Sequence, residues 1–493
     1  EDTGKHEFVD GFTRNEKFQA LVPDFLLFGE ERKVDLTSIY GTKKNKEIFK
    51  GIIEIFKNYK FTIEENTPIE EEIALDPELL GKAFENLLAF YNPETATTAR
   101  KQTGSFYTPR EIVDYMVDES LIAYLKGQLL KTNPVYVKFG EMQTQLFKDQ
   151  AENGQLIFTE SISKSRWEGK EDELENELRE LTHYNDKLHS FNEQEVQQLI
   201  FAIDHCKILD PACGSGAFPM GILHKLVYLL RKLDKEDKNG NTRWRELQKK
   251  KAQIELMKAL NEKDKKQREE KLIEINETFE NNASDFGRKL FLIENCIYGV
   301  DIQPIAIQIS KLRFFISLII DQNEKKGMEN RGIRPLPNLE TKFVAANTLI
   351  GLSGQMSLAL ANNEIINLQK ELQEVRHKHF EAKTRKDKLV CQKRDKEIRK
   401  QISSILISIG FPNDEADKIA DFDIYDQNNY ANWFAPEWMF GRDLENKFDI
   451  VNGNPPYGVN FPIEEKEYFK KNYKHQDYQP ESYLLFIEKS FDF

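Results

Sequence analysis

The sequence predicts an α/β fold whose parallel sheet holds a ligand at the carboxyl ends of its strands. One indication is the apolar run 208–209, which leads through Asp210 into a glycine-rich turn and then into a helix near Pro219. A second is the apolar run 448–451, beyond which two prolines follow Asn454 and stop a strand. Open α/β sheets bind ligands outside the carboxyl ends of their strands, so both motifs are expected at one edge.

The chain has 493 residues, which is room for two or three domains. We expect an N-terminal helical domain over residues 1–100 and a catalytic domain over 101–493. Polar helical insertions are expected at about 132–200, 232–290 and 356–412. In the last insertion, apolar side chains and one histidine recur at helical spacing and predict a helical hairpin packed on the domain. They are Leu368, Leu372, Val375 and His379. The strands of the sheet are expected near 206–210, 297–301, 343–346 and 448–452.

The turn after the first strand reads Asp210-Pro211-Ala212-Cys213-Gly214-Ser215-Gly216. Glycines supply positive φ and allow a ligand to approach the backbone closely. Pro219 fits the first turn of the following helix, where a missing N–H costs nothing. A dinucleotide-binding turn would carry a third glycine at that position, so the pattern disfavours NAD. For this segment alone, a structural turn capped by Asp210 is the alternative.

The second strand ends at Asp301, whose carboxylate could accept hydrogen bonds from both hydroxyls of a ribose. The usual separation between a glycine turn and this acid is about twenty residues, and here the separation is far longer. We attribute the excess to the helical insertion at about 232–290. Asp301 could also cap the helix that is expected to begin near Pro304.

The tetrapeptide Asn454-Pro455-Pro456-Tyr457 combines groups that can hold a planar amine. The Asn454 amide oxygen and the Pro455 carbonyl can accept its two N–H bonds, and the Tyr457 ring can stack beside it. A match of four residues is weak evidence by itself. It gains weight because the glycine turn precedes it.

Together with Thr103-Gly104-Ser105-Phe106-Tyr107-Thr108-Pro109-Arg110, these motifs resemble the amino-methyltransferases that use S-adenosylmethionine and act on adenine N6 in DNA. Their order along the chain is that of the gamma group. The long helical insertions look more specifically like the large bacterial methyltransferases fused to restriction endonucleases (type IIG). The resemblance covers most of the chain from about residue 65 and implies a Rossmann-like methyltransferase sheet. It also implies that further strands and a target-recognition domain follow the last helix, so we expect the chain to be a fragment.

The resemblance implies a set of residues that contact the cofactor. Phe106, Tyr107 and Thr108 would contact its methionine moiety, with the Thr108 hydroxyl on the carboxylate. The turn would carry its amino-acid end, Asp301 its ribose, and Ile302 its adenine ring. Asn347 would face the amine of that adenine. The turn residues are Asp210, Ala212, Gly214 and Gly216.

Three of these residues have ordinary structural alternatives. Asp210 could simply cap the following turn, without a role in cofactor binding. Asn347 could be a common turn residue at a strand end, and Tyr107 could be an ordinary half-buried aromatic. The catalytic residues implied by the resemblance are Asn454, Pro455, Pro456 and Tyr457. Double-stranded DNA would be the partner, with the target adenine flipped out of the stack because its amine is unreachable inside a duplex.

The composition limits the partners and the compartment. The net charge of −13 does not favour a DNA-binding surface, so either a basic face is local or the main DNA-binding part lies elsewhere, and we expect the second. There is no stretch of membrane-spanning length, and the four cysteines lack metal-ligand spacing, which predicts a cytoplasmic protein without a metal. Pro23-Asp24 and Glu31-Arg32-Lys33 lie too close for the metal-binding set of restriction nucleases and predict charges on a helix surface. No nuclease is predicted within these residues.

Three other functions share part of this pattern. Asn-Pro-Pro-Tyr also occurs in methyltransferases of protein glutamine N5 or RNA guanine N2, but those are compact chains without the Phe-Tyr-Thr-Pro segment. A subunit that only binds the cofactor would not need the intact tetrapeptide. A dinucleotide oxidoreductase is disfavoured by Pro219.

Overall fold

The computed structural model describes part of the chain. The described residues are 32–35, 46–49, 108–130, 165–185, 187–235, 242–260, 272, 276, 285–322, 336–352, 362–382, 384–426, 428–441, 448–475 and 480–493. The chain divides into two compact units, Glu1–Leu79 and Leu80–Phe493, which are described separately.

In the first unit, the described residues form two antiparallel strands, β1 (Arg32–Asp35) and β2 (Lys46–Phe49). These eight residues are strands where the sequence predicts helix, and Arg32 and Lys33 therefore do not lie on a helix surface. Pairing between the two strands outweighs the local helical preference of this charged segment. The other residues of 1–107 lie outside the described residues, so the N-terminal helical domain stays a prediction.

The second unit is built on a parallel sheet of four strands, and the predicted α/β fold class is confirmed. The order across the sheet is β5-β4-β3-β6, so β3 has the next two strands on one side and the last on the other. The point at which this order reverses lies between β3 and β6, where open sheets bind ligands. The strands are β3 (Ile208–Asp210), β4 (Ile297–Asp301), β5 (Phe343–Ala345) and β6 (Ile450–Val451).

Successive side chains of these strands are buried against opposite faces of the sheet. Ile208 and Ile297 belong to the core on one face, while Leu209, Tyr298 and Val344 belong to the core on the other. Strands that are covered on both faces need apolar residues at nearly every position. This is why the four strands are continuous apolar runs in the sequence.

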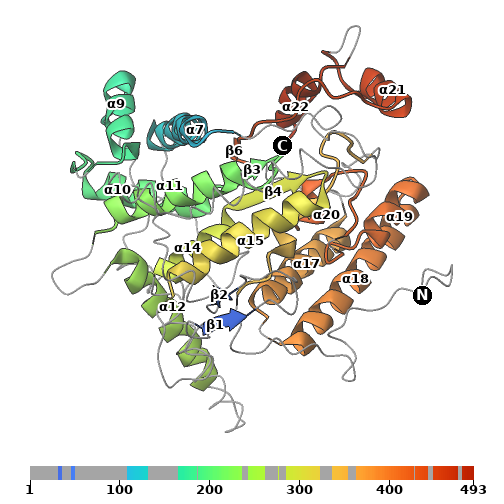
Figure 1. Cartoon of the computed structure of the whole chain (residues 1–493), viewed down its shortest axis with the longest axis horizontal. Helices are drawn as coiled ribbons and strands as arrows, with labels where there is room; N and C mark the ends of the chain where they lie inside the picture. Colours follow the sequence, from blue (N-terminus) through green and yellow to red (C-terminus); the bar gives the residue numbers. More distant parts are fainter. Residues whose placement is uncertain are drawn as a thin grey trace. The chain divides into compact units, whose positions relative to one another are not determined.

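Helices cover one face of the sheet and extend away from it (Figure 1). α15 begins at Pro304, as predicted, with the proline at its first position. α11 begins at Ala217, two residues before Pro219. The helices of this part are α7 (Arg110–Leu130), α9 (Glu171–Thr182), α10 (Glu193–His205), α11 (Ala217–Leu233), α12 (Arg243–Leu260), α14 (Asp285–Asn295) and α15 (Pro304–Ile320).

The predicted helical hairpin packs on the opposite face. Leu372, Val375 and His379 are buried at its first helix, and Leu368 packs on the same core. The short helix η3 (Leu339–Thr341) precedes β5. The helices on this face are α17 (Asn363–Glu381), α18 (Arg385–Ser408), α19 (Asn413–Asp421) and α20 (Pro436–Met439).

Two helices follow β6, α21 (Ile463–Asn472) and α22 (Ser482–Ser490). They enclose a separate small core with Leu349 of the segment after β5. None of the helices in the described ranges is both long and apolar enough to span a bilayer.

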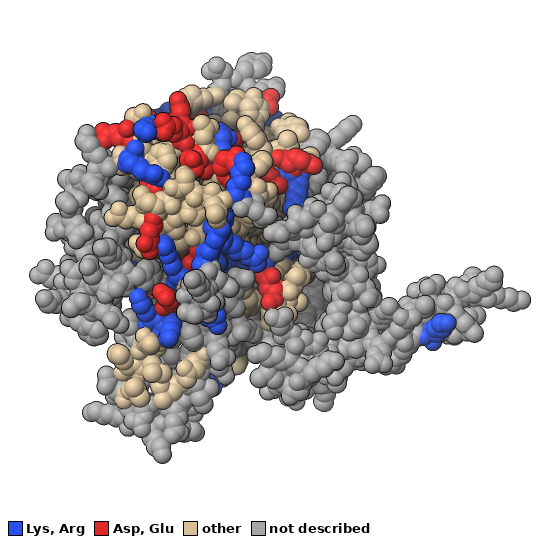
Figure 2. Space-filling model, turned by 90° about the vertical axis from the view of Figure 1, so that its left-hand side faces the viewer, with Lys and Arg blue, Asp and Glu red and all other residues tan. Residues whose placement is uncertain are grey.

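Acidic and basic side chains both occur on the face drawn in Figure 2. Ion pairs join neighbouring helices in this part of the molecule, for example Lys126 with Glu175 at 2.8 Å and Arg243 with Glu193 at 3.3 Å. These basic groups are therefore paired with carboxylates of the same chain.

Candidate active site

The glycine turn between β3 and α11 has the backbone that the sequence predicts. Gly214 has φ of 53° and Gly216 has φ of 86°, both in the left-handed region that favours glycine. A Cβ at Gly216 would also lie 2.8 Å from the Ser310 Oγ. α15 supports the turn: Ser310 donates to the Gly214 carbonyl at 2.9 Å and Arg313 donates to the Ser215 carbonyl at 3.0 Å.

Asp210, at the end of β3, is only 1% exposed. Its Oδ1 accepts a hydrogen bond from the Ala212 backbone N–H at 3.1 Å, which is the predicted cap of the turn. Its Oδ2 is buried and has no hydrogen-bond partner among the described residues. Burial raises the pKa of Asp210 well above its usual range. The hydrogen bond from Ala212 lowers this pKa and the negative charge of Asp301 raises it, but burial is the largest effect. The carboxyl thus offers an unused acceptor at the bottom of the turn.

Asp301, at the end of β4, binds backbone on both sides. Its Oδ2 accepts from the Gly214 N–H at 3.0 Å, and its Oδ1 accepts from the Gln303 N–H at 2.8 Å. The second bond closes a turn just before α15, whose N-cap residue is Gln303 and carries no side-chain cap, so Asp301 does not itself cap the helix as the alternative proposes. The first bond fixes β4 to the glycine turn. Ile302 is 46% exposed beside it.

Asn347 follows β5 and is buried. Its amide oxygen accepts from the Leu349 N–H at 3.2 Å, which is the turn that the structural alternative predicts. Its amide nitrogen donates to the Glu465 Oε1 at 3.4 Å. The neighbouring Thr348 donates to the Pro211 carbonyl at 2.7 Å, so the end of β5 is tied to the turn after β3.

The tetrapeptide begins directly beside the glycine turn. β6 pairs with β3, and the Asn452 N–H donates to the Leu209 carbonyl at 2.9 Å. A Cβ at Gly453 would lie 2.4 Å from the Asp210 Oδ1, so only glycine lets the chain pass here. Beyond it, Ser482 at the start of α22 donates to the Pro456 carbonyl at 2.6 Å. The Tyr457 ring is 47% exposed.

The amide nitrogen of Asn454 donates to the Thr108 hydroxyl at 3.1 Å. Thr108 lies just before α7, and this helix is in turn bound by Asn452. The Asn452 amide nitrogen donates to the Ser120 Oγ at 2.9 Å and to the Met116 carbonyl at 3.2 Å. No described residue donates a hydrogen bond to the amide oxygen of Asn454.

Hydrogen bonds and close packing thus join the start of α7 to the ends of all four strands. They bring together Thr108, Asp210, Gly214, Asp301 and Asn454. Phe106 and Tyr107 lie outside the described residues. Within the described ranges, no group of three or more His, Cys, Asp or Glu side chains could hold a metal ion.

Sequence reasoning missed several residues that hold the site together. Ser120, Ser310, Asn452 and Ser482 are polar residues whose partners lie on distant segments, and nothing in the local sequence marks them. Gly453 did carry a signal, because it separates two asparagines at the end of a predicted strand.

Comparison with known proteins supports the resemblance. Residues 295–493 match the family described as Eco57I restriction-modification methylase. Over 310 residues, or 63% of the chain, the sequence is 27% identical to a protein of Methanocaldococcus jannaschii named as a candidate type II restriction enzyme and methyltransferase. The matched part is 19% of that protein, so the chain spans about a fifth of its relative's length. The predicted resemblance to a restriction–modification methyltransferase is confirmed.

Proposed function

We propose that this chain, which carries a restriction–modification methylase domain over residues 295–493, transfers the methyl group of S-adenosylmethionine to the N6 atom of adenine in DNA. The observation that carries the proposal is the position of Asn454. It lies at the carboxyl end of β6, where the preceding Gly453 packs against Asp210 at the end of β3. A group held by Asn454 and a cofactor held by the glycine turn would therefore be neighbours.

The turn suits the amino-acid end of the cofactor. Left-handed glycines leave the backbone open to a ligand, and the Asp210 Oδ2 is a buried acceptor without a partner among the described residues. A cationic ammonium group would satisfy that acceptor and favour its charged form. When bound, the cofactor supplies a methyl group made electrophilic by its sulfonium.

Three other residues would complete the cofactor site. Asp301 lies at the end of β4 beside the glycine turn, and a carboxylate at this position can accept from ribose hydroxyls. Ile302 presents an exposed apolar side chain that can cover the adenine ring. Asn347 lies at the next strand end, where its amide can face the amine of that ring.

The chain's own contribution to the reaction is orientation and electrostatics. The Asn454 amide oxygen and the Pro455 carbonyl accept the two N–H bonds of the target amine, which draws the nitrogen toward tetrahedral geometry and frees its lone pair. The exposed Tyr457 ring stacks on the extruded base and offsets part of the cost of unstacking, about a few kcal/mol. No strong base is required. The N6 lone pair would take up the methyl group as the sulfonium–methyl bond breaks and leaves a thioether, and the methylated nitrogen, now cationic and acidic, would lose its proton to water.

The test is Asn454→Ala in the full-length enzyme, with Asn460→Ala as the matched control. Asn460 is an exposed asparagine of the same segment, whose side chain binds only Lys466 among the described residues. We expect N6-methyladenine, measured by mass spectrometry of digested DNA, to fall by about 100-fold or more in the first variant, the scale for one lost preorganised polar contact. Thermal stabilisation by S-adenosylmethionine should stay within error of the wild type in both variants.

Wild-type turnover by Asn454→Ala would contradict the proposal. So would labelled methyl that appears in protein glutamine or in RNA guanine and not in DNA, because either result would assign the site to the other methyltransferases that share the tetrapeptide.

A further inference from the structure

We infer that the Thr108 hydroxyl is a positioning group that fixes which end of the Asn454 amide faces the target base. The inference rests on the proposed function and deepens it, because it assigns a second role to a residue that the resemblance places only at the cofactor. It starts from the hydrogen bond of 3.1 Å between the Asn454 Nδ2 and the Thr108 Oγ1.

The two ends of an amide are not interchangeable here. The target amine brings two N–H donors, so it needs the amide oxygen; an amide turned by 180° would set donor against donor. With its nitrogen bound to Thr108, the Asn454 amide directs its oxygen away from Thr108. The Asn454 side chain is exposed, and Thr108 is its only hydrogen-bond partner among the described residues. Thr108 itself is buried, with 7% of its surface exposed.

A hydroxyl can also donate, and so Thr108 selects the correct orientation only when its proton is engaged elsewhere. The proposed cofactor carboxylate would accept that proton, and the remaining lone pairs of the hydroxyl oxygen would then accept from the Asn454 nitrogen. The amide orientation is therefore coupled to the cofactor. Thr108 connects the two halves of the site.

Helix α7 holds Thr108 at the correct distance. Asn452, two residues before Asn454, binds the Ser120 Oγ and the Met116 carbonyl of this helix. On another side, α7 packs closely on α11, since a Cβ at Gly221 would lie 2.6 Å from the Val113 Cγ1. The helix that delivers Thr108 is thus fixed to β6 and to α11.

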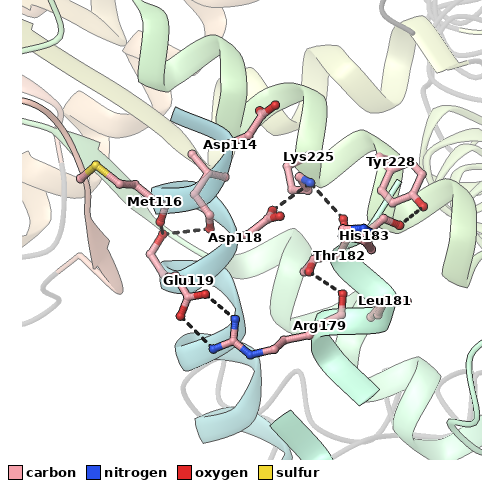
Figure 3. Close-up of polar contacts among 12 residues, drawn as sticks. Asp114, Met116, Asp118, Glu119, Arg179, Leu181, Thr182, His183, Lys225 and Tyr228 are labelled. Atoms are coloured by element: carbon pink, nitrogen blue, oxygen red, sulfur yellow. Dashed lines mark hydrogen bonds and ion pairs between the residues drawn. The ribbon is translucent and has the colours of Figure 1, made fainter. Parts of the chain in front are cut away.

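Two ion pairs add to this anchoring (Figure 3). Lys225 of α11 reaches the Asp118 carboxylate of α7 at 2.8 Å and the Thr182 carbonyl at the end of α9 at 2.9 Å. Glu119, on a neighbouring position of α7, pairs with Arg179 of α9. These contacts limit sliding and rotation of α7, and therefore movement of Thr108 relative to Asn454.

The experiment compares Thr108→Val, which keeps the shape but removes the hydroxyl, with Thr108→Ser, which restores it. At saturating S-adenosylmethionine, we expect kcat for DNA methylation to fall about 3- to 10-fold in the valine variant, the scale of one hydrogen bond, and to recover in the serine variant. Cofactor affinity, measured by calorimetry, should also fall in the valine variant, because the hydroxyl no longer contacts the cofactor carboxylate. This weaker binding does not affect kcat, since kcat is measured at saturating S-adenosylmethionine.

A second measurement does not depend on turnover. Duplexes with adenine or purine at the target position differ only in the amine that Asn454 holds. With S-adenosylhomocysteine bound, the ratio of their dissociation constants reports that contact. We expect the valine variant to lose about 3- to 10-fold of this discrimination and the serine variant to keep it.

Ser120→Ala tests the anchoring, with Ser404→Ala as the matched control. Each serine donates to the carbonyl four residues before it at 2.9 Å, but only Ser120 also accepts from Asn452. We expect Ser120→Ala to lower kcat and discrimination by a smaller factor while cofactor affinity stays unchanged, and Ser404→Ala to match the wild type.

Unchanged kcat and discrimination in Thr108→Val would overturn the inference and leave the proposed function standing. The proposed function fails separately, through turnover by Asn454→Ala. If thermal unfolding shows that Thr108→Val does not fold, Ser120→Ala is the test of the inference. Wild-type discrimination between the adenine and purine duplexes in Ser120→Ala would then also overturn it.

Discussion

At the scale of single residues, the two carboxyl oxygens of Asp210 differ in their hydrogen bonding. One carboxyl oxygen caps the glycine turn, and the other is buried without a hydrogen-bond partner among the described residues. The sequence identified the residue and its capping role, because an acid directly after an apolar run and before a glycine turn is a local pattern. It could not reveal the burial of the carboxyl, or that Gly453 just after β6 lies so close that a Cβ there would be 2.4 Å from the Oδ1.

Asp210→Asn should change stability with a defined dependence on pH. Burial raises the pKa of the wild-type carboxyl, so the native state favours the protonated form. The stability that the protonated Asp210 carboxyl contributes is fully present below the pKa that this group has in the unfolded chain. It is lost as the pH rises through the pKa that the group has in the folded protein. The neutral variant avoids this loss. We therefore expect the stability of the ligand-free variant to increase relative to that of the wild type as the pH rises from 4 to 8.

Urea unfolding of both proteins across that pH range measures the difference, with Asp417→Asn on the exposed surface of α19 as the control. The same substitution should weaken thermal stabilisation by S-adenosylmethionine. A free energy difference that is constant with pH would contradict the assigned protonation.

At the scale of elements, the hairpin of α17 and α18 is held by charges as well as by its apolar stripe. The Asp395 carboxylate binds Arg376 at 2.8 Å and Arg399 at 2.6 Å, and all three are buried. Burial opposes ionisation of Asp395, but the positive charges of the two arginines outweigh it and hold its pKa below the usual range. The sequence predicted the stripe. It could not identify this cluster, since a charged helix usually indicates a solvated face.

Asp395→Asn should destabilise the protein by about 3–5 kcal/mol, because it leaves two buried guanidinium groups without a counter-charge. The exposed pair between Glu371 and Arg394 joins the same two helices at 2.6 Å and gives the control. Glu371→Gln should cost less than about 1 kcal/mol. Urea unfolding at neutral pH compares the two, and equal losses would contradict the assigned importance of burial.

At the scale of the whole second unit, buried polar contacts join the outer helices to the helix that leaves the glycine turn. The Lys225 ammonium of α11 binds Asp118 and the Thr182 carbonyl, and it lies 3.8 Å from the centre of the Tyr184 ring. Lysine is almost never buried without partners. These contacts therefore specify how α7 and α9 pack against α11.

Lys225→Met should lower the free energy of unfolding by about 1–3 kcal/mol, because acceptors in α7 and α9 lose their donor while the apolar stem keeps its packing. Lys187→Met removes an exposed pair with Glu180 and should cost less than about 1 kcal/mol. Urea unfolding of both variants provides the measurement. A loss in Lys225→Met no larger than in Lys187→Met would contradict the role of the buried contact.

The sequence by itself determined the four strands of the parallel sheet, the glycine turn and the residues of the tetrapeptide, but not the antiparallel pair β1 and β2. Apolar runs, positive-φ glycines and strand-ending prolines act on the residues next to them, so they can be identified locally. Only the tertiary structure decided that β6 pairs with β3 and that Thr108 meets Asn454, which lies 346 residues further along the chain. The same holds for the buried charges at Asp395 and Lys225. Strand order and helix packing are set by contacts between distant segments, and local composition does not encode which segments meet.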